Sequence, residues 1–278
     1  MIQVDPTGGN DRDKVFEAFQ GAAFAFAVTV FIATLSKEKG IKEGEMYVDA
    51  AKHAKVKLPV WSGLEDMTGV TGGKYPLAHF DGKAQVTAYA KISSVPLVNV
   101  EAAMYMENYA TMDAPRKQPD GSFIFFGVAL SYANQTLLDT RHDYGLFVRK
   151  AIELPGLEEL YAHGDVISSE KMAQQWGEIT GQEVKYVQIP KDTFLKGAKE
   201  AGVPEPVAKE LLGMHLAVEE FGYFGKKIIG PSLTGLARAP HTWAEFIKAT
   251  DWSKIINCIR TSSKAQNKLL YETGMKSV

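Results

Sequence analysis

The sequence has very little cysteine and very little net charge, and both features narrow the range of proteins it can encode. Cys258 is the single cysteine among 278 residues, so the chain cannot form an internal disulfide and fits a reducing compartment. Lysine and arginine together number 31, against 33 aspartate and glutamate residues. This balance gives no overall field that would favour nucleic acid or an anionic membrane surface. We therefore expect a cytoplasmic protein.

A long apolar run is also missing, although one stretch comes close to it. Residues 15–35, "VFEAFQGAAFAFAVTVFIATL", are apolar almost throughout. The part after Gln20 is about 15 residues long, shorter than the ~20 residues that a helix needs to cross a bilayer. Gly21 is placed where a helix should stop, so the stretch predicts a helix, a turn and a buried strand at about 22–30. A membrane span is the less favoured alternative.

The sequence also lacks the glycine spacings that hold nucleotide phosphates. Neither G-x-G-x-x-G nor the Walker spacing occurs in it. Two glycine pairs, "TGGN" at 7–10 and "TGGK" at 71–74, lack the strand or the flanking residues that such loops need, and they are interpreted as turns. We assign no metal-binding residues from the sequence.

What the sequence does contain is an alternation of helices and apolar strands. Ser36 is a predicted cap for a helix that runs towards residue 53, and "KLPVWSG" is the next strand. A helix from "HFDGK" to about Ile92 and the strand "PLVNVEA" follow. This alternation predicts an α/β protein with a Rossmann-like, doubly wound parallel sheet. We expect this core in residues 1–156 and a smaller α/β C-terminal subdomain with a tail in 157–278.

The second half is less regular in sequence. "DTRHDYGLFVRKAIELP" predicts a loop and then a helix capped by Asp143, and a short pair of strands is expected after Pro155. A helix is expected from Ser168 or Ser169, followed by the strand "VKYVQIP".

His79 and Lys83 lie one helical turn apart and therefore on the same face. A lysine in this position can hold a cofactor ribose or nicotinamide and lower the pKa of a nearby proton donor. The spacing by itself favours a solvated pair at a helix start over this role. The single Tyr-x-x-x-Lys spacing, Tyr223 to Lys227, contains Gly225 and has no strand before it, so we attribute it to chance.

Several segments in combination closely resemble the NmrA-like family. They include "VWSGLEDMTGVTGGKYPLAHFDGKAQVTAYAK" and "VPLVNVEAAMYMENY", with later similarity in "DTRHDYGLFVRKAIE", "ITGQEVKYVQIP" and "TWAEFIKATDW". The resemblance covers roughly residues 1–252. The members of this family are atypical relatives of the short-chain dehydrogenases and include fungal regulators of nitrogen metabolism and NADPH sensors. The resemblance therefore implies that the cofactor is NADP(H), and it adds the nucleus to the cytoplasm as an alternative location of the protein.

The resemblance also implies a set of site residues. Lys83 matches the lysine near the nicotinamide, and His79 stands where a dehydrogenase has its catalytic tyrosine, so these two are the candidate catalytic residues. Glu107 more closely fits an ion pair or a cap. The candidate cofactor-binding residues are Thr29, Phe31, Ser62, Lys83, Tyr105 and Asn108.

The chain departs from the family pattern at its start. It begins at what resembles the third strand, "MIQVDP", so the sequence as given lacks the family's first strands and its phosphate-binding turn. We therefore expect weak or no NADP(H) binding, and an exposed sheet edge through which the chain could form a homo-oligomer.

Three functions stay open at this point. The first is an NADP(H)-linked regulator that binds a partner of the transcription-factor type. The second is an NADPH-dependent reductase or isomerase of a small carbonyl or enone substrate, in which Lys83 orients the cofactor and His79 or a pocket tyrosine donates the proton. The third is a chain that is degenerate or starts too late.

Overall fold

The computed structural model describes residues 12–112, 114–156 and 158–257. The expected first strand, "MIQVDP", and most of the C-terminal tail lie outside the described residues. Within them the chain forms two compact units, and both units draw on segments from either side of residue 156. Of the described residues, unit 1 contains 12–102, 144–156, 158–162 and 224–238, and unit 2 contains 103–112, 114–143, 163–223 and 239–257.

Unit 1 is built on a parallel sheet, which confirms the predicted fold class. The sheet has the order β1-β2-β3-β8, and every neighbouring pair of strands is parallel. Every residue of β2 and β3 is buried, as expected for central strands that are covered on both faces. Within the described part of the chain, β1 has no strand on its outer side. The strands are β1 Phe24–Ala27, β2 Leu58–Gly63, β3 Val98–Ala102 and β8 Glu159–Ala162.

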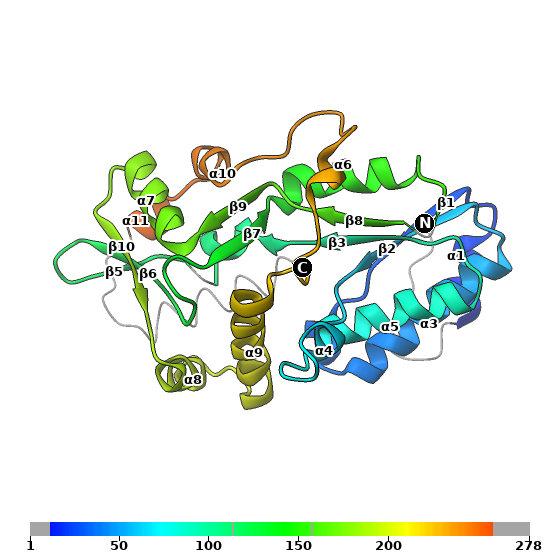
Figure 1. Ribbon diagram of the computed structural model, residues 1–278, viewed down its shortest axis with the longest axis horizontal. Coiled ribbons are helices and arrows are strands. Elements are labelled where there is room, and N and C mark those ends of the chain that lie inside the picture. The colour runs from blue at the N-terminus through cyan, green and yellow to red at the C-terminus, as the bar shows by residue number, and fades with distance from the viewer. Residues whose placement is uncertain (1–11, 113, 157, 258–278) are drawn as a thin grey trace. The chain divides into compact units, whose positions relative to one another are not determined.

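Two long helices cover one face of this sheet. Figure 1 shows α3 (Lys37–His53) and α5 (Ala78–Ile92) side by side against β1 and β2. The predicted cap of α3 is confirmed, because the side chain of Ser36 accepts a hydrogen bond from the backbone N–H of Lys39. Between sheet and helices lies an apolar core made of Val48, Trp61, Val86, Ala90, Val95 and Leu97. Unit 1 also contains α1 (Arg12–Phe19), α2 (Phe31–Thr34), α4 (Met67–Val70) and most of α6 (Thr140–Ala151).

The apolar stretch 15–35 is divided as the sequence predicts, with two differences. The strand was expected to be buried, but the residues of β1 alternate between exposed and half-buried, because no strand among the described residues lies on its outer side. Helix α1 ends at Phe19, and Gly21 follows it with a φ of 74°, a left-handed conformation that suits glycine. The strand is shorter than the predicted 22–30, because β1 stops at Ala27 and Phe31 already begins α2. Among the described residues, no helix is both long enough and apolar enough to span a bilayer.

Unit 2 contains two three-stranded sheets, with the orders β10-β6-β5 and β4-β7-β9. The expected strand pair after Pro155 is not a pair: β8 joins β3 in unit 1, whereas β9 runs antiparallel to β7. The strands of unit 2 are β4 Met104–Tyr105, β5 Arg116–Lys117, β6 Phe123–Gly127, β7 Asn134–Leu138, β9 Asp165–Ser168 and β10 Val184–Gln188. Its helices include η2 Met106–Ala110, α7 Ser169–Thr180, α8 Lys191–Glu200, α9 Glu205–Phe221, α10 Trp243–Ala249 and α11 Ser253–Ile256.

The helix starts in unit 2 follow local capping rules. Ser168 caps α7, as the sequence predicts. Helix α6, however, begins at Thr140 rather than at Asp143, and the carboxylate of Asp139 accepts the backbone N–H of His142. Asp143 is therefore a residue of the first helical turn, wholly buried, and the prediction that it caps the helix is wrong.

Candidate functional site

The carboxyl end of β2 in unit 1 carries Ser62, and Lys83 of α5 reaches it. The ammonium of Lys83 donates a hydrogen bond of 2.6 Å to the backbone carbonyl of Ser62 and lies 5.1 Å from the centre of the Trp61 ring. Burial lowers the pKa of Lys83 to about 8, and the negative charge of Glu43 opposes this change. The sequence placed these two residues at one site, and the structure brings them into contact.

The start of α5 is fixed by a buried carboxylate within the same unit. Asp81 accepts hydrogen bonds from the backbone N–H groups of Leu77 and Thr68 and from the Thr68 hydroxyl. These bonds tie the helix to the loop that contains α4. They fix the start of α5 two residues before Lys83.

Tyr144 is a residue of this site that the sequence did not single out. Its hydroxyl oxygen lies 2.9 Å from the hydroxyl of Ser62 and 3.0 Å from the carbonyl of Val100. Phe26 of β1 packs edge-on against the ring, with 6.1 Å between the ring centres. The sequence offered only the presence of a tyrosine in the segment that is predicted to form a helix after residue 139. The 82 positions that separate it from Ser62 gave no reason to connect the two.

His79, Phe31 and Thr29 also belong to unit 1. The rings of His79 and Phe31 lie 5.8 Å apart between centres, and His79 contacts the edge of Phe80 as well. Thr29 is buried in the segment that leaves β1. His79 therefore stands among aromatic rings rather than in a purely solvated position.

Tyr105 and Asn108 lie in unit 2, in β4 and η2. The Asn108 amide is directed to the sulfur of Met104, 3.6 Å away. Glu107 behaves as a cap: its Oε1 accepts the Thr140 hydroxyl and the backbone N–H of Arg141 at the start of α6. Whether Tyr105 and Asn108 contact a cofactor stays a prediction.

A second polar group in unit 1, which was not predicted, is buried near the carboxyl end of the central strand β3. Glu101 of β3 is 2% exposed, and its Oε1 accepts the Asn99 amide at 2.9 Å. Burial raises the pKa of Glu101 to about 8, and the negative charge of Glu65 adds to the rise. Lys227 forms ion pairs with Glu65 at 2.7 Å and with Glu159 at 3.3 Å. The Tyr-x-x-x-Lys spacing thus ends in a structural lysine.

The sequence as a whole matches the model of the NmrA-like family over residues 6–247. The chain is 25% identical over 221 residues to the nitrogen metabolite repression protein nmr of Neurospora crassa. That alignment includes 76% of this chain and 44% of the Neurospora protein, so the chain spans less than half the length of this relative.

Solved structures show the same fold at low sequence identity. The negative transcriptional regulator NmrA in complex with NADP superimposes with a TM-score of 0.66 at 18% identity, covering 99% of this chain and 82% of that one. The NADPH-dependent quinone oxidoreductase QOR2 of Escherichia coli, complexed with NADPH, gives 0.70 at 20% identity, covering 89% and 82%.

Proposed function

Because this chain belongs to the NmrA-like family, we propose that it is an NADP(H)-linked regulator or redox sensor that acts through a protein partner. The observation that carries the proposal is the position of Lys83, whose ammonium is held at the carboxyl end of β2. Ligands of doubly wound sheets bind outside this end of the strands. The NmrA relative bound to NADP supports the choice of cofactor.

The described residues fit one half of the cofactor better than the other. The ammonium of Lys83 and the hydroxyls of Ser62 and Tyr144 are suitable partners for a ribose and a carboxamide. The glycine spacing that lets a pyrophosphate approach a helix start does not occur in the 278-residue sequence. Each charge-assisted hydrogen bond to a phosphate stabilises binding by about 1.5–3 kcal/mol. We therefore propose that this chain binds NADP(H) weakly.

A thermal-shift titration tests cofactor binding. A ligand at ten times its Kd that binds only the folded state stabilises it by about 1.4 kcal/mol. For a protein of this size the melting temperature should then rise by roughly 3–6 °C. The variant Lys83→Met should abolish the rise, whereas Lys39→Met, a control on α3, should keep it. An equal rise in both variants, or no rise with NADPH at any concentration, would count against the proposal.

Regulation through a partner needs its own experiment. The tagged chain should retain a transcription-regulator partner from an extract, and the amount retained should differ between NADPH and NADP⁺. If the chain retained the same amount of partner with NADPH, with NADP⁺ and without nucleotide, it would not be a redox sensor, even though it would still bind the partner.

The contact between Tyr144 and Ser62 favours a second function, that of an NADPH-dependent reductase of a small carbonyl or enone substrate. Bound NADPH would supply a hydride to the substrate carbon. Tyr144 or His79 would then donate the proton to the substrate oxygen, and Ser62 would orient that oxygen. This function predicts NADPH oxidation with a carbonyl or quinone panel, lost in Lys83→Ala and reduced in Tyr144→Phe. No oxidation with any substrate would favour the sensor.

A further inference from the structure

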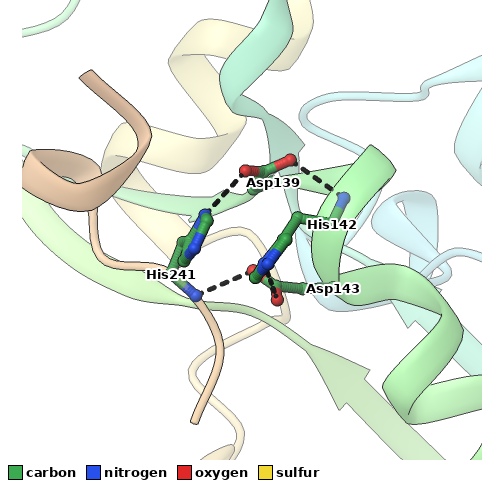
Figure 2. Close-up of side chains that lie close together, drawn as sticks. All are labelled: Asp139, His142, Asp143 and His241. Atoms are coloured by element: carbon green, nitrogen blue, oxygen red, sulfur yellow. Dashed lines mark hydrogen bonds and ion pairs between the residues drawn. The ribbon is translucent and has the colours of Figure 1, made fainter. Parts of the chain in front are cut away.

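Four metal-ligating side chains converge within unit 2, and none of them belongs to the cofactor site described above. They are Asp139, His142, Asp143 and His241, and one candidate ligand atom from each lies within 4.8 Å of the other three. Figure 2 shows the two aspartates facing the two imidazole rings, with His241 approaching from a separate segment of the chain. From this geometry we propose that the four residues form a binding site for a divalent transition-metal ion such as Zn²⁺.

The two imidazole rings are stacked on each other and each is held by a carboxylate. The ring centres lie 3.6 Å apart with an angle of 12° between the planes. Nδ1 of His142 lies 2.8 Å from Asp143, and Nδ1 of His241 lies 3.0 Å from Asp139. Neutral imidazole is the form that binds metal.

The donor set and its dimensions suit zinc. Two imidazole nitrogens and two carboxylate oxygens bind Zn²⁺ at about 2.0–2.2 Å in a tetrahedron, which puts the ligand atoms about 3.4 Å apart. Spacings of up to 4.8 Å therefore have to shorten, and the two nearly parallel rings have to turn relative to each other, because a bound ion lies in the plane of each imidazole that holds it. His142 is about 41% exposed, which provides a path of entry for the ion.

The charge balance at the start of α6 also favours a cation. Asp143 is wholly buried and Asp139 nearly so. Glu107 binds the same helix start through Oε1, and its Oε2 is buried without a hydrogen-bond partner. Three carboxylates thus surround one helix start. The helix dipole offsets about half a charge, and a divalent ion would offset most of the remaining negative charge.

The segment that carries His241 is held firmly in place. The His241 backbone N–H donates to Asp143 at 2.8 Å, and the buried Trp243 anchors the residues that follow. Thr242 and Glu245 form a capping box at the start of α10. Gly164 has no side chain, and any side chain there would collide with the carbonyl of His241. Pre-positioned ligands of this kind lose little conformational entropy when a metal binds.

The test uses the untagged chain after dialysis against a chelator. We expect one equivalent of Zn²⁺ by calorimetry and mass spectrometry, and a visible absorption band when Co²⁺ replaces it. His142→Ala and His241→Ala should each weaken Zn²⁺ binding by more than about 100-fold, because loss of an outer-shell partner alone weakens it by 10–100-fold. His53→Ala, which removes an exposed imidazole from unit 1, is the matched control and should bind normally.

Two further variants make the result decisive even if an alanine variant folds poorly. Asp139→Asn keeps a good helix cap while removing a charged ligand, so it should fold and still bind zinc more weakly. Gly164→Ala should displace His241 and weaken binding without removing any donor. The proposal is overturned if the parent chain takes up neither Zn²⁺ nor Co²⁺, or if Asp139→Asn and the histidine variants bind as the parent does. The cluster would then be a clamp between α6 and the segment before α10.

Discussion

Replacing Glu101 by glutamine should stabilise the protein above neutral pH, by an amount that grows with pH. In the folded chain Glu101 is buried in β3 with its Oε2 lacking a hydrogen-bond partner. Its pKa is raised to about 8, first by burial and then by the charge of Glu65. The unfolded chain releases this proton near pH 4.5.

The direction of the pH effect follows from these two pKa values. Between pH 4.5 and 8 the folded state binds more protons than the unfolded state, so the free energy of unfolding falls as the pH rises. The slope for one proton is about 1.4 kcal/mol per pH unit. The accumulated loss is on the order of 3–5 kcal/mol at pH 8, and it is absent below pH 4.5.

Glutamine keeps the shape of the side chain and does not titrate. Its carbonyl can accept the Asn99 amide as Glu101 Oε1 does. Its amide can donate, and the Asn99 Oδ1 is a buried acceptor without a partner. Glu101→Gln should therefore behave like the protonated wild type at every pH.

Urea denaturation at pH 5, 6.5 and 8, followed by tryptophan fluorescence, measures this difference. The stability gained by Glu101→Gln should be small at pH 5 and reach a few kcal/mol at pH 8. Glu153→Gln, which removes an exposed carboxylate paired with Arg149, should shift stability by less than about 0.5 kcal/mol at each pH. A gain that does not change with pH, or a loss at pH 8, would refute the reasoning.

Two other predictions concern the helices and the edge of unit 1. Gly44→Ala should destabilise the protein by about 1–2 kcal/mol, because a methyl group there collides with Val86. Gly40→Ala, on the same helix, places its methyl group in open space and should stabilise the protein by about 0.5–1 kcal/mol. The midpoints of urea denaturation measure both changes in stability. If the two substitutions changed stability in the same direction, the packing of α3 on α5 described above would be contradicted. If copies of the chain associate through β1, Phe24→Lys should lower the association measured by sedimentation, since Phe24 is 44% exposed on that strand. Ile92→Lys, at an exposed position on α5, should leave association unchanged, and an equal effect of the two lysines would rule out the edge.

Local features of this chain could be predicted from its sequence because they depend on residues a few positions apart. Ser36 and Ser168 each accept a hydrogen bond from the backbone N–H three residues later, so the capping residue and the helix that it caps occur in one short stretch of sequence. The apolar strands β2 and β3 could be recognised from composition, and parallel pairing followed from their alternation with helices. The family resemblance named Lys83 and Ser62 as candidates for the same cofactor site, and the structure adds that the two residues are in contact.

The groupings that depend on distant segments were decided by the tertiary structure. Tyr144 meets Ser62 across 82 positions, and His241 meets Asp139 across 102. The correct start of α6 at Thr140 also matters, because it turns Asp139 into a cap and buries Asp143 beside the histidines. No local pattern encodes such contacts, since they arise only when strands pair and chain reversals bring remote helix starts together. The local sequence therefore determines most helices and strands, whereas the packing of those helices and strands determines which residues surround each polar side chain.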